Sequence, residues 1–231
     1  MSNPSIVVVG AGPGVSGAVA RRFAEAGYDV ALIGLLPDQL EPLAEELSGL
    51  GVAAVWAEAD VTDPGGLTTA VRELAEQLGN EGGHVDVLHF NPSAFRQRTP
   101  LTLNVAELLE DVALGVGALL TSVQAARPYM GEGGRITATG SVAADKPSPE
   151  AASLGVQKAA LRNLVRSLDR TVQPDGIRAV SVTVDGTLDR DDESSPMHPR
   201  QVAEAIYAAS VRPDGEWTDE VRHPAPTAPR P

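Results

Sequence analysis

The sequence predicts a single α/β domain in which a doubly wound parallel sheet lies between two layers of helices. Short apolar segments of strand length alternate along the chain with longer amphipathic segments of helix length. The strand segments are apolar at nearly every position, as is usual for parallel strands that helices cover on both faces. A glycine-rich turn also joins the first strand segment to the first helix segment. Together these observations favour a three-layer α/β/α fold.

The segments can be placed in chain order from their apolar runs and helix signals. Strands are expected at Ile6–Gly10, Asp29–Ile33, Val52–Ala57, Val85–Phe90, Arg135–Thr139 and Ile177–Val184, with a short last strand near Trp217–Arg222. Helices are expected at Val15–Ala26, Pro37–Leu50, Pro64–Leu78, Val105–Met130 (broken along its length), Pro149–Val172 and Pro199–Ser210. Asp63 before Pro64, and Asn104 three residues before Glu107, have the spacing of helix N-caps. Residues 1–222 form the predicted domain, and residues 223–231, with four prolines in nine residues, are predicted to be a disordered tail.

Composition and charge narrow the classes of function. The 231 residues include no cysteine, so disulfides and thiolate chemistry are excluded. The net charge of −13, from 31 acidic and 18 basic residues, argues against binding to nucleic acid or to an anionic membrane. The four histidines lack the spacing of a metal site, and no apolar run is long enough to cross a bilayer. Because no signal peptide is recognisable, we expect a cytoplasmic protein that acts on a small molecule.

The glycine-rich turn at residues 10–17 reads Gly-Ala-Gly-Pro-Gly-Val-Ser-Gly. Glycines let the backbone turn sharply and come close to a pyrophosphate, which the amide dipoles at a helix N-terminus attract. The turn lies between a predicted strand and a predicted helix, as in the dinucleotide-binding Rossmann fold. The candidate cofactor contacts in it are Gly10, Gly12, Pro13, Gly14 and Val15. The alternative is a tight turn that binds nothing.

From the first predicted strand to the last, the chain resembles the short-chain dehydrogenase/reductases. The loop of that family reads Thr-Gly-x-x-x-Gly-x-Gly. Gly10 and Gly14 match it, whereas Val9 and Ser16 replace its first and last residues. This resemblance implies a Rossmann fold and a nicotinamide cofactor.

Other positions of the chain match the family's pattern in part. Asp60 and Val61 fall on the pair after the third strand, which implies contact with adenine. Asn91 retains the second Asn of the family's Asn-Asn-Ala-Gly turn after the fourth strand. Asp185 and Gly186 fall where the family has Pro-Gly beside the nicotinamide.

The catalytic pattern of the family is a Ser, a Tyr thirteen positions later and a Lys four beyond the Tyr. Ser141 and Lys158 match this pattern, but the position of the Tyr holds Leu154. The family's Asn on an earlier helix falls at Leu114 or Gly115. The Ala-Ser-Leu-Gly before the lysine, and a Trp-Thr-x-Glu-Val that begins at residue 217, are similar to a divergent bacterial branch of the family. The missing Tyr is therefore expected to be a feature of that branch.

Loss of the tyrosine changes the expected chemistry. In the family its hydroxyl transfers the proton at the carbonyl oxygen while hydride moves at the carbon, and such acid–base help is worth ~10²–10⁴ in rate. Leucine has no proton to transfer. The resemblance leaves Ser141 to hydrogen-bond a substrate oxygen, and Lys158 to hold the cofactor ribose or to protonate substrate through a water.

The residues that select between cofactors are both missing. NAD-preferring relatives have an acid at the end of the second strand, and NADP-preferring relatives have an arginine just after it. Here that stretch reads Ile-Gly-Leu-Leu at residues 33–36, and Pro13 stands where a second basic residue often lies. Because nothing would pair with a 2′-phosphate, NAD is favoured over NADP. A site that has lost its dinucleotide is a third alternative.

Three functions stay open at this point: an atypical NAD(P)-dependent oxidoreductase of a small carbonyl or alcohol, a non-redox cyclase or isomerase, and a catalytically silent binding subunit. Arg96 and Arg98, after the Asn91 turn, are candidates for contact with an acidic substrate, with surface charge as the alternative. Members of the family commonly dimerise through the helices after the fourth and fifth strands. The second of these helices is rich in small residues, which predicts a homodimer or homotetramer.

Overall fold

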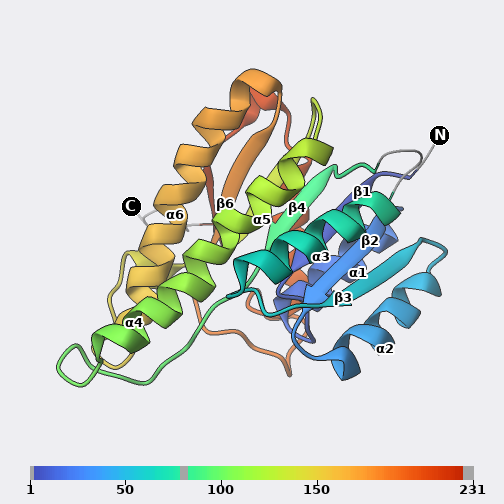
Figure 1. Ribbon diagram of the computed structural model, residues 1–231. Helices are drawn as coiled ribbons and strands as arrows, with labels where there is room; N and C mark the ends of the chain where they lie inside the picture. The colour runs from blue at the N-terminus through green and yellow to red at the C-terminus, as the bar shows by residue number, and fades with distance from the viewer. Residues whose placement is uncertain (1–2, 79–82, 226–231) are drawn as a thin grey trace.

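The computed structural model describes residues 3–78 and 83–225 of the chain (Figure 1). Its strands are β1 (Ser5–Val9), β2 (Asp29–Gly34), β3 (Ala54–Glu58), β4 (Val87–Phe90), β5 (Arg135–Ser141), β6 (Arg178–Val184) and β7 (Glu220–His223). They form one parallel sheet in the order β3-β2-β1-β4-β5-β6-β7. The predicted doubly wound fold is confirmed. The order reverses between β1 and β4, and ligands of such sheets bind at the carboxyl ends of the strands beside this point.

Helices cover both faces of the sheet. One layer contains α1 (Val15–Glu25), α2 (Pro37–Ser48) and α7 (Pro199–Ser210). The other contains α3 (Pro64–Gln77), α4 (Val105–Val112), α5 (Ala118–Ala126) and α6 (Ala152–Val172), which lie side by side in Figure 1. This arrangement confirms the three-layer architecture that the strand–helix alternation predicts.

The sheet separates two apolar cores, and β1 shows why its sequence is continuously apolar. Ile6 and Val8 pack into the core beneath α1, α2 and α7, whereas Val7 and Val9 pack into the core beneath α3, α5 and α6. All four side chains are fully buried. Because successive side chains of a strand point to opposite faces, a strand covered on both sides needs apolar residues at every position.

The two N-caps predicted from the sequence are confirmed. The Asp63 carboxylate accepts a hydrogen bond from the Gly65 amide at 3.0 Å, at the start of α3. At the start of α4, Asn104 and Glu107 form a reciprocal capping box, with bonds of 2.8 and 3.2 Å. Each cap satisfies amide groups that the first helical turn leaves without a partner.

The expected break in the long helix over residues 105–130 is a π-helical turn, Ala113–Gly117, between α4 and α5. The helix expected from Pro149 begins later, at Ala152. The difference has a local cause, because Ala151 forms a β-bridge with Arg98 and the Ala152 amide donates to the Arg98 carbonyl at 3.1 Å. This pairing ties the backbone before α6 to the segment after β4.

The end of the domain lies slightly beyond the expected boundary at residue 222. His223, expected in the tail, is the last residue of β7, and its carbonyl accepts a hydrogen bond from the Asp185 amide at 2.8 Å. Most of the predicted tail, residues 226–231, lies outside the described residues. None of the helices in residues 3–78 and 83–225 is both long and apolar enough to cross a membrane.

Candidate functional site

The glycine-rich turn follows β1 at the carboxyl edge of the sheet. Gly10 has a φ of +77°, which favours glycine because a side chain would clash with its own backbone. A Cβ atom at this residue would also lie 2.7 Å from Cγ of Pro92. The amides of Gly10 and Ala11 both donate to the carbonyl of Ile33, at 2.9 and 2.8 Å. The turn is thus fixed between β2 and the segment after β4, and it requires glycine at its first position.

The turn leads directly into the N-terminus of α1. Gly14 is the N-cap of this helix, and within the described residues no side chain caps it and no acidic residue lies in its first turn. The hydroxyl of Ser16 is buried and donates to the Gly12 carbonyl at 3.4 Å. The first amides of α1 are therefore left to solvent or to a ligand, and the helix dipole favours an anion there.

Two adjoining cavities open at this edge, and Gly10, Asn91 and Ser93 line both of them. The larger has a volume of about 750 Å³, and the smaller about 370 Å³. The larger cavity is lined by Gly12, Pro13, Gly14, Val15, Ser141, Leu154 and Lys158, among others. The smaller is lined by Leu35, Leu36, Gln39, Asp60, Val61 and Leu114, among others. All the candidate cofactor contacts predicted from the sequence therefore lie along one continuous cleft.

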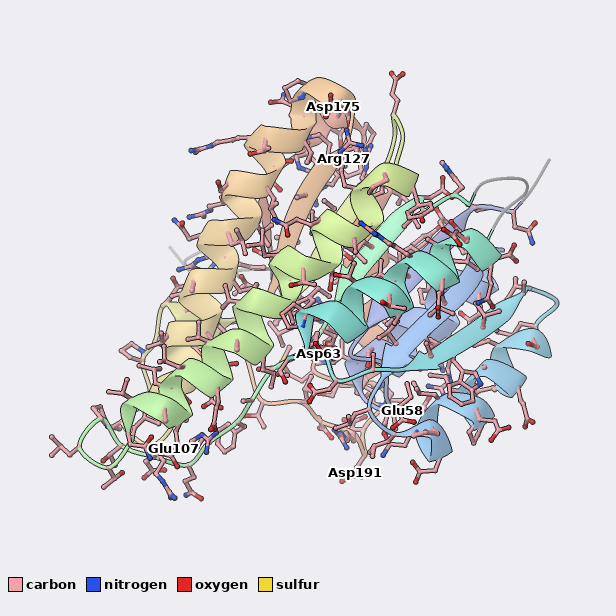
Figure 2. All side chains as sticks on the ribbon, viewed as in Figure 1. Glu58, Asp63, Glu107, Arg127, Asp175 and Asp191 are labelled. Atoms are coloured by element: carbon pink, nitrogen blue, oxygen red, sulfur yellow. The ribbon has the colours of Figure 1, made fainter. Side chains whose placement is uncertain are left out.

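Figure 2 shows where the carboxyl ends of the strands lie in the whole molecule. Asp63, soon after β3, and Asp191, in the segment after β6, lie toward the same end of the sheet. Arg127 and Asp175 lie at the opposite end, where they form an ion pair of 2.6 Å. The cleft therefore belongs to the end of the sheet at which the strands finish, as the topology requires.

Ser141, Leu154 and Lys158 meet in the larger cavity. Ser141 ends β5, and its hydroxyl oxygen accepts a hydrogen bond from the Ala143 amide at 3.2 Å, which leaves the hydroxyl proton for another acceptor. Leu154 and Lys158 lie one turn apart on α6. Of the described residues that line this cavity, none is a tyrosine. At the position predicted for the family's tyrosine, Leu154 thus lines the cavity with an apolar side chain.

Lys158 is almost completely buried, with 4% of its surface exposed. Its Nζ donates to the carbonyl oxygen of Thr139 at 2.9 Å. Burial disfavours the charged form and lowers the pKa of Lys158 to about 8. The group is still mainly protonated at pH 7, but a neutral fraction becomes accessible just above it.

A buried polar chain behind Asn91 is not predicted by the sequence. The Thr139 hydroxyl donates to the side-chain oxygen Oδ1 of Asn91 at 2.8 Å. The backbone N–H of Asn91 donates to the Val9 carbonyl at 3.0 Å. Nδ1 of His89 is 2.9 Å from the Thr137 hydroxyl, and burial, together with the charge of Lys158, lowers the pKa of His89 to about 3. His89 is thus a neutral packed residue, and the chain of hydrogen bonds fixes Asn91 between the two cavities.

Gln157 is a second buried group that sequence reasoning missed. Its Oε1 accepts from the Ala94 amide at 3.1 Å, and its Nε2 donates to the Ala94 carbonyl at 3.2 Å. A Cβ atom at Gly115 would lie only 2.5 Å from that Oε1. The π-helical turn therefore needs glycine at the position beside Gln157, while Leu114 lines the smaller cavity. Neither residue at which the resemblance places the family's Asn, Leu114 or Gly115, has a polar side chain.

The two arginines considered for an acidic substrate are held by carboxylates of α4. Arg96 forms ion pairs with Asp111, Glu107 and Glu110 at 3.0, 3.3 and 3.1 Å. Arg98 lies 3.6 Å from Glu107. These pairs fasten the segment after β4 to α4, so the alternative of a structural surface charge fits both residues better. Within the described part of the chain, no group of three His, Asp or Glu side chains could hold a metal ion.

Comparison with known proteins decides the family. The sequence pattern of the short chain dehydrogenases matches residues 4–191. The chain belongs to this family of oxidoreductases. It is 31% identical over 179 residues to a cis-4-hydroxycyclohexanecarboxylate dehydrogenase of Sinomonas cyclohexanicum, covering 76% of this chain and 70% of the relative. It is 28% identical over 218 residues to an L-2,3-butanediol dehydrogenase of Corynebacterium glutamicum, covering 89% and 83%.

A solved structure extends the comparison to the cofactor. The short-chain dehydrogenase of Burkholderia cenocepacia, crystallised in complex with NADP, superimposes with a TM-score of 0.83 at 28% identity and covers 95% of this chain and 96% of its own. The residues present here fit such a group, because the turn brings its backbone close to the open N-terminus of α1. The two cavities on either side of Asn91 provide room for the two halves of a dinucleotide.

Proposed function

We propose that the protein binds a nicotinamide dinucleotide along the two cavities and uses it to oxidise or reduce a small alcohol or carbonyl compound with altered acid–base chemistry. The observation that carries this proposal is the meeting of Ser141, Leu154 and Lys158 in the cavity that the glycine-rich turn opens into. The glycines, Asp60, Val61 and Asn91 would hold the dinucleotide. The relative solved with NADP supports the choice of cofactor class.

The nicotinamide ring, when bound, would give or accept the hydride. The Ser141 hydroxyl oxygen accepts a bond from the Ala143 amide, so its proton is not used in that bond. Ser141 would donate this proton to the substrate oxygen and so orient it. Lys158 uses one N–H on the Thr139 carbonyl, and its two others are available to ribose hydroxyls or to a water at the substrate oxygen. Leu154 supplies no proton, so the proton at that oxygen must come from Lys158 through water or from solvent.

We further propose that NAD is preferred over NADP. Asp60 is the charged residue among those described around the smaller cavity, and neither an arginine nor a lysine lines that part of the structure. A 2′-phosphate placed there would meet a carboxylate and no cation, which costs binding energy. Gln39, whose Oε1 lies 3.4 Å from a Cβ position at Gly12, would offer an uncharged amide to a ribose there instead.

Titration of the purified protein with NAD, NADH, NADP and NADPH tests both proposals. Thermal shift and nicotinamide fluorescence are the readouts, and a stability gain of ~2.7 kcal/mol is expected at a hundredfold excess of ligand over its Kd. NAD(H) should bind more tightly than NADP(H). Absence of a shift with all four at millimolar concentration would contradict dinucleotide binding, and tighter binding of NADPH would contradict only the preference.

Leu154 itself favours a second candidate, a member of the family that binds a ligand in the same cleft without hydride transfer, as a non-redox enzyme or a silent subunit. We also propose that the leucine characterises a branch of the family rather than this chain alone. Leu154→Tyr, discussed below, separates the two candidates, because it restores the proton donor without altering the glycine-rich turn.

Self-association is proposed through the outer face of α4, α5 and α6. Val105 and Leu109 on α4 and Val156 on α6 are large apolar side chains with 71%, 61% and 47% of their surface exposed. Small residues of α6, including Gly155 and Ala159, permit close approach of a second helix. We propose that a second copy of the chain covers this face, in a homodimer or homotetramer.

A further inference from the structure

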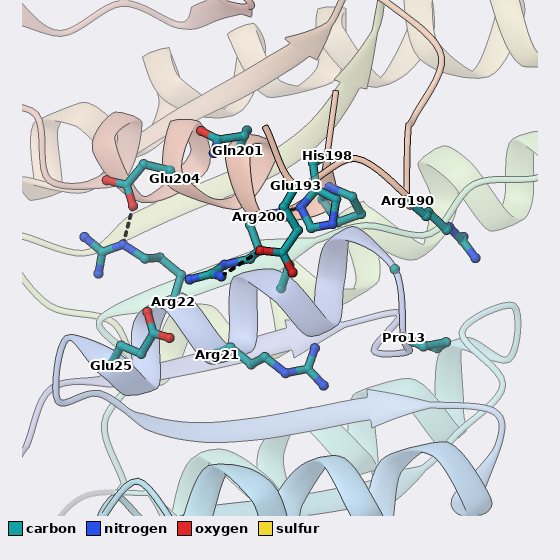
Figure 3. A pocket seen from close by; sticks show the side chains of 13 residues that line it. Pro13, Arg21, Arg22, Glu25, Arg190, Glu193, His198, Arg200, Gln201 and Glu204 are labelled. Carbon is teal, nitrogen blue, oxygen red and sulfur yellow. Dashed lines mark hydrogen bonds and ion pairs between the residues drawn. The ribbon is translucent and has the colours of Figure 1, made fainter. Parts of the chain in front are cut away.

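Arg190 lies in the segment between β6 and α7 and reaches over the glycine-rich turn. One terminal guanidinium nitrogen is 3.5 Å from the position a Cβ atom would take at Gly14, the N-cap of α1. Arg190 lines the larger of the two cleft cavities, the one of about 750 Å³. It also lines a third cavity, of about 780 Å³, which lies next to the cleft between α1 and α7 and is called the neighbouring cavity below. It therefore stands at the place where the open helix N-terminus meets the cleft (Figure 3).

The other arginines around the neighbouring cavity have carboxylate partners. Arg22 pairs with Glu204 at 2.5 Å and Arg200 with Glu193 at 3.6 Å, as the dashed lines in Figure 3 show. Within residues 3–78 and 83–225, no carboxylate lies at ion-pair distance from Arg190, which in Figure 3 extends on the side of Pro13. Its charge is thus available to a ligand.

Two acidic residues close to Arg190 in the sequence, Asp189 and Asp192, hold turns of the segment. Oδ1 of Asp189 accepts from the amides of Asp191 and Asp192, at 3.1 and 3.2 Å. Oδ1 of Asp192 accepts from the amide and the hydroxyl of Ser194, at 2.9 and 2.6 Å. These two carboxylates shape the turns of the segment, and neither forms an ion pair with the exposed side chain of Arg190.

The base of the segment is fixed. The Asp189 amide donates to the Met197 carbonyl at 3.1 Å, and the Met197 side chain fills the space beside Gly186, where a Cβ atom would lie 2.4 Å from its sulfur. Arg190 is therefore attached one residue beyond a closed loop, next to the glycine-rich turn. Lys158 and Arg190 are the cations among the described residues that line the larger cavity, and Lys158 is buried at the substrate end.

We propose that Arg190 binds the pyrophosphate of the dinucleotide beside the N-terminus of α1. The proposal rests on the proposed function. A pyrophosphate carries two negative charges, whereas the protein carries a net charge of −13, so a fixed cation at this point offsets general repulsion. The guanidinium also suits the geometry of phosphate oxygens, because it donates two parallel hydrogen bonds.

Arg190→Gln tests the proposal. The matched control is Arg200→Gln, which removes an arginine of the neighbouring cavity that already pairs with Glu193. NAD, ADP-ribose and adenosine are titrated against parent and variants at low and high salt, and circular dichroism monitors folding. Arg190→Gln should weaken NAD and ADP-ribose roughly 10- to 100-fold and flatten the salt dependence of their binding. Adenosine, which lacks the pyrophosphate, should bind parent and variant equally. Arg200→Gln should stay within about twofold of the parent for all three ligands.

Each other result overturns the proposal in a distinguishable way. If the parent binds neither NAD nor ADP-ribose, the proposed function fails and the proposal for Arg190 fails with it. If the parent binds both and Arg190→Gln binds them equally well, the proposed function stands and only the role of Arg190 is refuted. Equal weakening of adenosine by Arg190→Gln would show a general disturbance of the cleft and would also refute the role.

Discussion

At the scale of single residues, the cleft combines a buried lysine, Lys158, with a leucine, Leu154, at the position predicted for the family's tyrosine. The resemblance to the family's Ser–Tyr–Lys pattern predicted that Ser141, Leu154 and Lys158 lie together, and all three line the larger cavity. The contacts of Lys158 could not be predicted in the same way. Its bond to the Thr139 carbonyl and the link from Thr139 to Asn91 depend on how two strands and a helix pack.

The first prediction is that Leu154→Tyr gains dinucleotide-dependent carbonyl reduction over the parent. The new hydroxyl would lie between Ser141 and Lys158, and a nearby ammonium should hold the tyrosine pKa below its usual value of about 10. A panel of ketones and quinones measures the rate, and ultraviolet titration measures the tyrosinate. Acid–base assistance is worth up to ~10²–10⁴, and the polar group missing at Leu114 should keep the gain toward the lower end.

Asn163→Tyr is the control, because it adds a tyrosine at an exposed position of the same helix. Asn163→Tyr should reduce carbonyl substrates no faster than the parent, and its added tyrosine should titrate near the usual pKa of about 10. A Leu154→Tyr variant that binds NAD(H) as the parent does, yet reduces no substrate faster, would favour the non-redox or silent candidate.

The second prediction concerns the buried charge. In the folded protein the pKa of Lys158 is lowered to about 8 from an ordinary 10.5, so the folded state binds the proton less tightly than the unfolded state. The resulting cost of ~3 kcal/mol is fully present below pH 8 and is relieved as the pH rises toward 10.5. Relative to Lys158→Met, the parent should therefore gain ~2 kcal/mol of unfolding free energy between pH 7 and pH 9.5.

Urea unfolding of both proteins at the two pH values measures this difference. The comparison between pH values cancels the packing change that methionine introduces, because that change does not titrate. The lowered lysine pKa would be contradicted if the unfolding free energy of the parent relative to Lys158→Met stays constant, or falls, as the pH rises from 7 to 9.5.

At the scale of elements, the sequence predicted the strands and α-helices of the described residues to within a few residues, since buried parallel strands and amphipathic helices have distinct apolar patterns. It predicted a break in the helix over residues 105–130 but not its form. Gly115 of the π-helical turn packs against Gln157, which lies on α6 and binds the backbone of Ala94. Local patterns contain no information about such a contact between distant segments.

The third prediction follows from that contact. Gly115→Ala should lower the free energy of unfolding by ~1–3 kcal/mol, because the new methyl group would meet Oε1 of Gln157 at 2.5 Å in a fully packed site. Gly117→Ala is the matched control in the same turn, where a Cβ atom meets nothing within 4 Å. It should be neutral or stabilising, since alanine is the better helix former.

Urea unfolding of the single variants and of Gly115→Ala combined with Gln157→Ala completes the test. The shorter side chain at residue 157 makes room for the methyl group, so the two effects should add to less than their sum. Equal destabilisation by Gly115→Ala and Gly117→Ala would refute the steric explanation, and full additivity would refute the role of Gln157.

At the scale of the whole molecule, the sheet order gathers the cleft residues from segments spread along most of the chain. The last strand, β7, is an edge strand of the sheet. Glu220 of this last strand lies 2.8 Å from Arg166 and 3.4 Å from Arg162, both on α6, and accepts from the Thr183 hydroxyl at 2.7 Å. The fold was predictable because its signals repeat. The placement of Arg190 and Gln157 was not, because each lies beside a distant segment of the chain that only the finished fold brings close.

The last prediction is that the protein is a homodimer or homotetramer at micromolar concentration and that the outer face of α4, α5 and α6 forms the contact. Exposed apolar side chains on this face, Val105, Leu109 and Val156, should be covered by a second copy, since burial of apolar area drives association. Leu109→Glu should convert the assembly to smaller species in light scattering. Leu50→Glu, at an apolar residue with similar exposure beside α2, should not.

Ionic strength gives this prediction a second readout. Each copy carries a net charge of −13, so bringing two copies together is opposed by repulsion that salt screens. Association of the parent should therefore strengthen between about 50 and 500 mM salt, where the Debye length falls from more than 10 Å to a few ångströms. A parent that is monomeric at both salt concentrations, or a Leu109→Glu variant that assembles as the parent does, would show that this face remains open to solvent.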